Sequence, residues 1–213
     1  MKTPITSRFQ NVVTSEAEIR AIVPPAEGGA VTKVIDRIDD HCRRFIARSP
    51  FLVIASGSAP VGIDVSPKGD PAGFVHVLDE HTIAIPDRPG NNRLDTFTNI
   101  LREPAVGVIF FVPRRKETLR VGGRAAIVRD ESLRRSMAMD GKVPELAVVI
   151  DVERAYFHCA KCMVRSNLWD PARWPDTAGL SSLGEALRDH ARLHYSAREI
   201  DDYLAADERE GLY

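Results

Sequence analysis

The sequence predicts an α+β fold in which an antiparallel β-barrel is flanked by helices and followed by a helical tail. From residue 51 onward, short runs of apolar and β-branched residues alternate with turn residues, a texture typical of strands joined by tight turns. Two helical patterns, near residues 94–101 and 132–139, interrupt these strands. Because most of the strands follow one another through tight turns, we expect an antiparallel barrel.

Composition and length exclude several classes of protein. The chain has 213 residues, enough to bury a sizeable core without disulfides or metal ions. Its formal net charge is −1, so no global charge favours nucleic acid or a bilayer surface. The sequence contains no run of about 18 apolar residues that could span a membrane. Its N-terminal segment lacks the apolar core of a secretory signal. Three cysteines do not form a disulfide framework. We therefore expect a soluble, cytoplasmic protein with no nucleic-acid or membrane partner.

Three regions are expected along the chain. They are an N-terminal arm (1–29), a main domain (30–172) and a C-terminal helical extension (173–213). The arm is poorly patterned, although Ser15 and Glu18 are spaced as a capping box for one short helix. The extension carries only thin apolar stripes, which suits helices at a surface or against a partner.

The main domain is expected to open with one amphipathic helix over residues 30–48, because its apolar residues recur at helical spacing. Six or so strands follow, drawn from segments 51–57, 61–66, 73–79, 81–86, 105–112, 117–130 and 145–158. A turn at 58–60 joins the first two. The segment 105–112 is nearly all apolar and suits a central strand buried on both faces. Gly122 and Gly123 indicate a bulge or a close backbone approach in the next strand.

The stretch HTIAIPDRPGNNRLDTFTNIL, residues 81–101, is expected to form a strand, a polar loop and a helix. Leu94, Phe97 and Leu101 recur at helical spacing, and Asn91 or Asn92 is a candidate N-cap. A loop that leads into a helix presents unpaired N–H groups, which suit an anion such as phosphate. Arg88 and Arg93 flank this loop and add positive charge. An ordinary capped loop explains the same residues equally well.

The stretch DVSPKGD, residues 64–70, is a second candidate for anion binding. Lys68 can neutralise a phosphate, and the Ser66 hydroxyl can donate a hydrogen bond to an anion or to the polar edge of a ring. The alternative is a solvated turn with a charged tip.

Cys159 and Cys162 form a CxxC pair, which is compatible with a zinc half-site, a redox dithiol or haem attachment. Zinc needs a second ligand pair that this sequence lacks, and haem attachment needs a histidine where Met163 stands. A redox dithiol is typical of a strand-to-helix start in a parallel βαβ unit, which the hairpin pattern does not supply. The sequence favours two independent thiols in a helical turn, and no metal site is predicted.

His158, Lys161 and Arg165 are spaced at three and four residues. If residues 157–166 are helical, the three side chains project from one face as a cationic ridge. Such a ridge could hold an anion or lie beside an electron-rich cofactor, and a solvated face is the alternative. The sequence has no HExxH, Walker or GxGxxG motif, so hydrolase and dinucleotide-fold interpretations have no local support.

The order of these motifs resembles a known family. The segments IDVSPKGDPAGF, HTIAIPDRPGNNRLDTFTNIL, EPAVGVIFFVP, ETLRVGGRAAIV and AYFHCAKCMVRSNLWDP follow one another as in the FMN-binding split barrels related to pyridoxamine 5′-phosphate oxidase. The likeness covers about residues 45–172. It is similar in detail to a bacterial subgroup with the signatures DVSP-[RK]-GD, PDRPGN-x-R-x-DT-x-x-NIL and FHCAK.

The resemblance implies a six-stranded split β-barrel that forms a homodimer, with FMN in a groove at the subunit interface. Carried over by position, two loops would hold the phosphate, the ribityl chain and one edge of the isoalloxazine: Ser66, Lys68 and Gly69 in one, and Arg88, Asn91, Asn92, Arg93 and Thr96 in the other. His158, Lys161 and Arg165 would reach the flavin or the substrate from the C-terminal segment.

One departure from the family pattern bears on the reaction. The oxidases that act on vitamin B6 have a Trp-Gln pair and an Arg-Leu-His-Asp run near their C-terminal end, where this chain has Phe157-His158-Cys159 and Arg165-Ser166-Asn167-Leu168. We therefore expect an FMN-dependent oxidoreductase with another small organic substrate and an electron donor such as NAD(P)H. A flavin-binding or storage module without turnover is the alternative, and no catalytic residue is assigned.

Overall fold

The computed structural model describes residues 4–59 and 62–213, and its contacts divide the chain into two units, Met1–Val34 and Ile35–Tyr213. The first unit contains a 3-10 helix (Ile5–Ser7), α1 (Glu16–Ile22) and α2 (Gly29–Thr32), and none of its described residues is buried. Ser15 caps α1 as expected, because its hydroxyl accepts from the Glu18 N–H at 3.3 Å. The division into an arm, a main domain and an extension stays a prediction.

The single helix predicted over residues 30–48 is wrong. Within residues 30–48 the chain is helical only at α2 and at α3 (Asp40–Ile46). Between them, Ile35 is extended and exchanges two backbone hydrogen bonds with Ala155, at 3.0 and 2.7 Å. Asp39 then starts α3 anew, since its carboxylate accepts from the Cys42 N–H at 2.8 Å. Apolar spacing alone does not reveal a bridge residue or a second cap.

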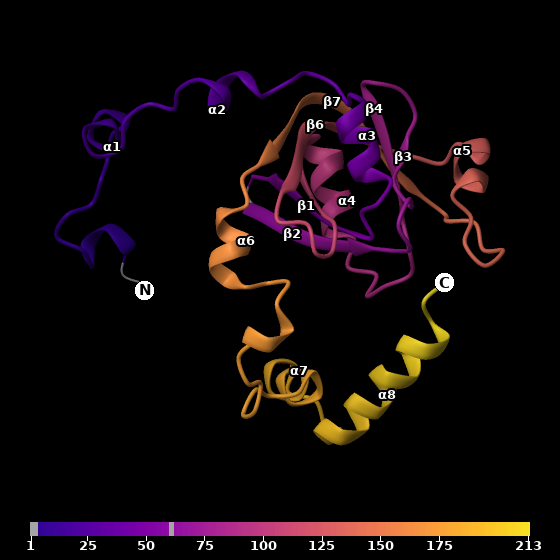
Figure 1. The fold of residues 1–213 in the computed structure, drawn as a ribbon. Coiled ribbons are helices and arrows are strands. Elements are labelled where there is room, and N and C mark those ends of the chain that lie inside the picture. Colours follow the sequence, from indigo (N-terminus) through magenta and orange to yellow (C-terminus); the bar gives the residue numbers. More distant parts are fainter. Residues whose placement is uncertain (1–3, 60–61) are drawn as a thin grey trace. The chain divides into compact units, whose positions relative to one another are not determined.

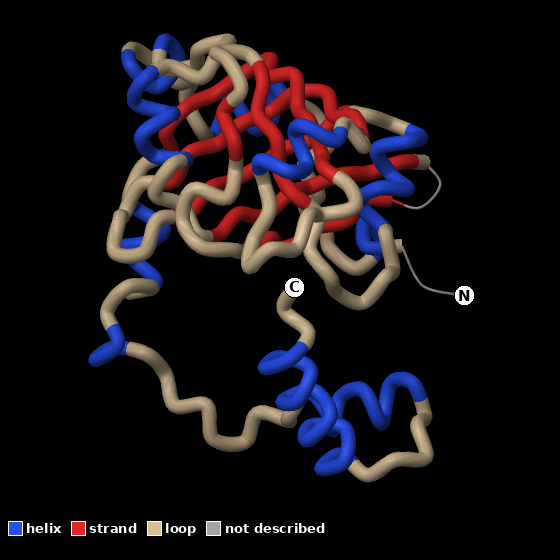
Figure 2. Tube along the Cα trace, turned by 90° about the vertical axis from the view of Figure 1, so that its right-hand side faces the viewer, coloured by secondary structure: helices blue, strands red, loops and turns tan. Residues whose placement is uncertain are grey.

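A single antiparallel sheet forms the body of the second unit (Figure 1). Its strand order is β2-β1-β5-β6-β7-β4-β3. The strands are β1 (Phe51–Ser58), β2 (Gly62–Gly69), β3 (His76–Val77), β4 (Thr82–Pro86), β5 (Ala105–Phe111), β6 (Thr118–Val128) and β7 (Ala147–His158). Figure 2 shows them as one curved sheet with helices at its margins.

This architecture confirms the α+β, antiparallel split-barrel fold with flanking helices. In the described residues the sheet has seven strands, where the family resemblance implied six. One of the seven is very short: the segment predicted at 73–79 pairs over only two residues, β3. The remaining helices are α4 (Asp95–Arg102), α5 (Glu131–Ser136), α6 (Lys161–Ser166), a 3-10 turn (Pro171–Arg173), α7 (Leu183–Ala191) and α8 (Ala197–Glu210). Two predicted residues, Pro60 in the first turn and Val61 in the second strand, lie outside the described residues.

Most of the core occupies one face of the sheet, and a second, smaller buried cluster contains Ala84, Met137 and Ala147. In β5, Val106, Val108 and Phe110 are buried, whereas the residues between them are partly or fully exposed. The prediction that this strand is buried on both faces is therefore wrong, because the core covers only one side of it. The predicted bulge is confirmed by a register shift between Gly122 and Gly123 in the β6–β7 pairing.

No helix in the described ranges, 4–59 and 62–213, has the length and apolar character needed to cross a bilayer.

Candidate functional site

Helix α4 is fixed to the sheet by a buried amide. Asn99 is 2% exposed, and its Oδ1 accepts from the Ser58 hydroxyl at 2.9 Å. Its Nδ2 donates to the Ser56 hydroxyl oxygen at 3.3 Å. Both serines belong to β1, so these bonds fix the position of α4 against that strand (Figure 1). Sequence reasoning missed Asn99, although an amide beside Ile100 on a buried helix face is a signal for such a bond.

The start of α4 differs from the predicted N-cap. Leu94 occupies the cap position with a left-handed φ of 58° and no side-chain cap, and Asn92 is also left-handed at 56°. Asn91 instead accepts from the Arg93 N–H at 3.1 Å, within the loop. A left-handed leucine is strained, and such strain is typical of functional loops.

The helix predicted here is confirmed as α4, but the three residues whose spacing predicted it do not share a buried face. Leu94 and Leu101 are 50% and 77% exposed, and only Phe97 of the three is buried. The buried face consists of Thr96, Phe97, Asn99 and Ile100. Two of its four side chains are polar, so the spacing of hydrophobic residues alone does not identify the buried face of this helix.

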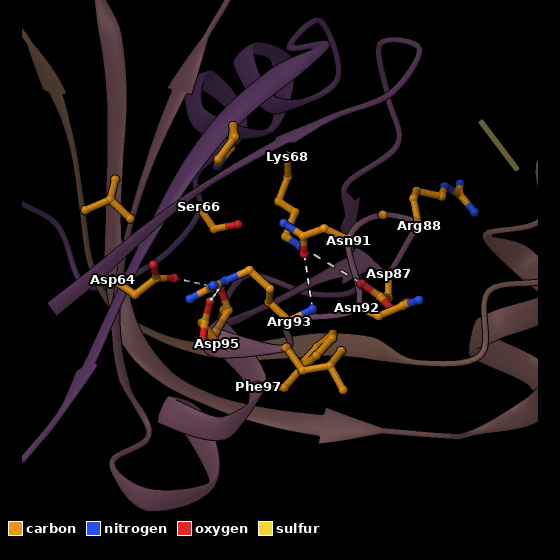
Figure 3. A pocket seen from close by; sticks show the side chains of 15 residues that line it. Asp64, Ser66, Lys68, Asp87, Arg88, Asn91, Asn92, Arg93, Asp95 and Phe97 are labelled. Carbon is orange, nitrogen blue, oxygen red and sulfur yellow. Dashed lines mark hydrogen bonds and ion pairs between the residues drawn. The ribbon is translucent and has the colours of Figure 1, made fainter. Parts of the chain in front are cut away.

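Two adjoining pockets lie between β2, the 87–94 loop and the start of α4, with volumes of about 270 and 300 Å³. Figure 3 shows the first of them. Eight of the residues predicted from the sequence line these pockets: Ser66, Lys68, Arg88, Asn91, Asn92, Arg93 and Thr96 in the first, and Gly69 in the second. The loop expected at residues 66–69 is instead the end of strand β2, and the structure brings this strand and the 87–94 loop to one place.

Strand alternation explains which β2 residues face the pocket. Asp64, Ser66 and Lys68 are partly buried, while Ile63 and Val65 between them are exposed on the other face. Near Asp64, the Thr96 hydroxyl donates to the carboxylate at 3.4 Å and links β2 to the first turn of α4.

Lys68 is a partly buried cation beside Phe97. Its Nζ lies 4.0 Å from Asp87 Oδ1 and 5.9 Å from the centroid of the Phe97 ring, and its side chain is 27% exposed. Burial raises the pKa of Asp87, and the charge of Lys68 partly opposes that rise. Lys68 therefore faces a carboxylate that is poorly solvated.

Arg88 is held by a buried carboxylate. Its Nε donates to Asp70 Oδ2 at 2.7 Å, and its Nη2 donates to the Met137 carbonyl at 3.0 Å. Asp70 also accepts from the Tyr213 hydroxyl at 2.5 Å, and the guanidinium lies 5.5 Å from the centre of that ring. In Figure 3 the guanidinium of Arg88 points away from Lys68. The stem of Arg88 thus lines the pocket while its charge is paired outside it.

Sequence reasoning did not identify Asp70 or Tyr213 as partners of Arg88. Asp70 stands in the DVSPKGD motif, but its side chain is only 1% exposed, which a turn-like sequence does not indicate. Tyr213 has no local signal, because its contact with Asp70 spans 143 residues.

Arg93 is the exposed cation of the site. Its side chain is 70% exposed and its Nε lies 2.7 Å from Asp95 Oδ2. Asp95 raises the pKa of Arg93 above its ordinary value, through a hydrogen bond and through its negative charge. Each of the three cations therefore faces a carboxylate, and an anion entering the pocket competes with these acids for Lys68 and Arg93.

His158, Lys161 and Arg165 do not line either pocket. The helix predicted over 157–166 is wrong at its start, since β7 runs to His158 and α6 begins only at Lys161. His158 pairs with Thr118 at the edge of β6, whereas Lys161 and Arg165 are one turn apart on α6. The expected single cationic face is therefore not formed.

Among the residues described, no group of three or more His, Cys, Asp or Glu side chains is arranged to hold a metal ion. Cys159 and Cys162 are exposed free thiols, and Cys42 is a buried one.

Comparison with known proteins decides the family. Residues 38–159 match the family model of pyridoxamine 5′-phosphate oxidase, which is more than half of the chain. The chain belongs to this family. The matched region contains both segments that line the pockets, β2 and the 87–94 loop. It ends at Cys159, before Lys161 and Arg165.

The comparison with solved structures found similar chains at low identity. HupZ from Group A Streptococcus is 19% identical, with a TM-score of 0.45 over 56% of this chain and 93% of that chain. General Stress Protein 26 from Bacillus anthracis is 14% identical, with a TM-score of 0.42 over 54% and 88%. An FMN-binding protein from Syntrophomonas wolfei is 12% identical, with a TM-score of 0.41 over 55% and 88%. No curated protein matches the sequence. The family assignment thus rests on the sequence match.

Proposed function

We propose that this protein is an FMN-binding flavoprotein and an oxidoreductase that acts on a small organic substrate. One observation carries the proposal: strand β2 and the 87–94 loop, which are distant in sequence, converge on one pair of pockets whose donors suit a flavin phosphate and its ribityl chain. Membership of the pyridoxamine 5′-phosphate oxidase family supports the choice of a flavin.

The residues present fit FMN in chemical type. Lys68 and Arg93 are the cations available to the phosphate, since Arg88 is already bound to Asp70. The remaining groups suit the hydroxyls of the ribityl chain and the polar edge of the ring; they are Ser66, Gly69, Asn91, Asn92 and Thr96. Both signs of charge are present, so the fit depends on direct contacts more than on the net field.

We propose further that the protein acts as a homodimer and that the second copy completes the site. The face of the sheet opposite the core exposes Ile63 (83%), Val65 (61%) and Phe51 (41%), which together form an apolar surface on β1 and β2. Part of this surface is the outer face of β2, and the inner face of the same strand carries side chains that line the pocket. Dimerisation through it would bring a second chain to the pocket, where the C-terminal groups His158, Lys161 and Arg165 of that chain can approach the flavin.

When bound, the flavin would supply hydride and electron transfer. The chain's own residues bind and orient it, and a cation such as Lys161 or Arg165 would stabilise the negative charge that develops on reduction. An electron donor such as NAD(P)H is the expected small-molecule partner.

Reconstitution tests the proposal. Purified protein is incubated with FMN, freed of unbound ligand and examined by visible absorption and light scattering. We expect the two-band spectrum of bound flavin on a dimer. A preparation that stays colourless would overturn the proposal, and a flavin-loaded monomer would rule out an interface site. Anaerobic addition of NADH and NADPH then separates an oxidoreductase, which bleaches, from a storage module, which neither donor reduces.

A further inference from the structure

Cys159 and Cys162 lie on either side of a junction between a strand and a helix. β7 ends at His158, so Cys159 is the first residue beyond the strand. α6 begins at Lys161, so Cys162 is the second residue of the helix. Both thiols are exposed. The sequence pattern had suggested one helix through this region, and the strand-to-helix junction is what the structure adds.

The backbone between the two cysteines has the geometry of a disulfide loop. Ala160 adopts φ −71° and ψ −12°, and its carbonyl accepts from the Val164 N–H at 3.0 Å, so the right-handed turn begins there. Cα atoms three residues apart in such a turn are separated by about 5 Å. Disulfides form across Cα separations of about 4.4 to 6.8 Å, so the separation of this pair lies within the range of a disulfide.

The surroundings favour a dithiol over a metal site. Among the described residues, no third or fourth ligand accompanies the two cysteines. Cys42 provides a contrast within the same chain, because it is 1% exposed and burial raises the pKa of its thiol to about 12. The chain thus has two accessible thiols beside each other and one that is protected.

We propose that Cys159 and Cys162 are a redox-active dithiol that closes to an intramolecular disulfide by exchange with a small-molecule disulfide. One thiolate attacks the external disulfide, forming a mixed disulfide and releasing one small thiol. The second cysteine attacks the mixed disulfide and releases the other small thiol. The two cysteines lose two electrons and two protons, and the external disulfide is reduced to two thiols. This activity does not depend on flavin binding.

Exchange with oxidised glutathione tests the proposal on the full chain. The protein is incubated with increasing ratios of oxidised to reduced glutathione, quenched with acid, alkylated under denaturing conditions and analysed by peptide mass spectrometry. We expect the wild type to lose two hydrogen atoms, to carry no glutathione and to keep Cys42 as its one alkylated cysteine. The linked peptide should contain Cys159 and Cys162.

Single substitutions provide the control. Cys162→Ser removes the resolving thiol, so Cys159 should accumulate glutathione, and Cys159→Ser should leave the adduct on Cys162. Because the second thiol acts intramolecularly, the wild type should carry at least about tenfold less adduct than either variant. Adducts on both cysteines of the wild type, three alkylated cysteines at the most oxidising ratio, or a disulfide between two chains would each overturn the proposal.

Discussion

Arg88 donates through Nε to the carboxylate of Asp70 at 2.7 Å, and both side chains are largely removed from solvent. The pair joins the end of β2 to the loop that lines the pocket. Asp70 is 1% exposed and Arg88 is 16% exposed, so neither charge is well solvated on its own. We interpret this contact as the support that holds the pocket loop in place, and Arg88 as its anchor.

Replacing Asp70 with asparagine should destabilise the fold. The substitution leaves the guanidinium of Arg88 without its counter-charge, and breaking a buried pair in this way costs about 3 kcal/mol. Urea titration measures the free energy of unfolding. Asp202→Asn is the control, because Asp202 is 76% exposed and lies 3.8 Å from Arg198, so its loss should be much smaller. Equal losses in the free energy of unfolding for the two variants would show that the buried pair does not stabilise the fold.

Asn99→Ala should also destabilise the protein, by about 2–3 kcal/mol, because it leaves the hydroxyls of Ser56 and Ser58 buried beside a cavity. The free energy of unfolding measures the loss. Leu101→Ala on the same helix is the matched control, since Leu101 is 77% exposed and should change stability little. A larger loss for Leu101→Ala than for Asn99→Ala would show that the buried amide does not hold α4 to the sheet.

Asp87→Asn should stabilise the protein at neutral pH. Because burial raises the pKa of Asp87, the folded state binds its proton more tightly than the unfolded state does. Stability is therefore lost as the pH rises from the ordinary value of 3.8 through the raised value, and the loss persists above it. The gain from the substitution should be present at neutral pH and absent in acid. Unfolding at several pH values tests this, and a variant less stable than the wild type at neutral pH would contradict it.

Val65→Glu should convert the proposed homodimer into a monomer. Val65 is 61% exposed on β2 and also borders the first pocket, and a carboxylate there is solvated in a monomer but buried in the proposed dimer. Light scattering measures the mass, and far-ultraviolet circular dichroism checks the fold. Leu180→Glu is the control, because Leu180 is 75% exposed in the C-terminal segment. A dimer that survives Val65→Glu would place the interface elsewhere.

The strands of this protein were largely predictable from the sequence, because alternation and turn residues are local properties. β1, β4, β6 and β7 lie close to their predicted segments, and Gly122 and Gly123 were correctly placed at a bulge. Eight of the eleven residues proposed as cofactor contacts lie at one pair of pockets for a similar reason, and their role in binding a cofactor stays a prediction. These eight residues belong to two continuous motifs, and the structure brings those motifs to one pair of pockets.

The errors arose where a residue is determined by a distant partner. Ile35 leaves the helical pattern because it pairs with Ala155, and Asn99 is buried because two serines of β1 bind it. Arg88 was predicted to face a ligand, but Asp70 and Tyr213 hold its charge. Such partners lie tens of residues away, and helical or strand periodicity carries no information about them.

The central claim is that the pocket binds the phosphate of FMN, chiefly through Lys68. The most direct test is a fluorescence titration of FMN and of riboflavin with the wild type, Lys68→Ala and Arg93→Ala. Lys68 is the less exposed cation, so its loss should weaken FMN binding by about 10- to 100-fold, and riboflavin binding little. Arg93 is 70% exposed and should matter less.

Arg198→Ala, which removes one positive charge at a side chain 91% exposed on α8, should leave both affinities unchanged. The wild type should prefer FMN over riboflavin, and Lys68→Ala should abolish most of this preference. Equal affinity of the wild type for the two flavins, or equal losses for both in Lys68→Ala, would contradict the central claim.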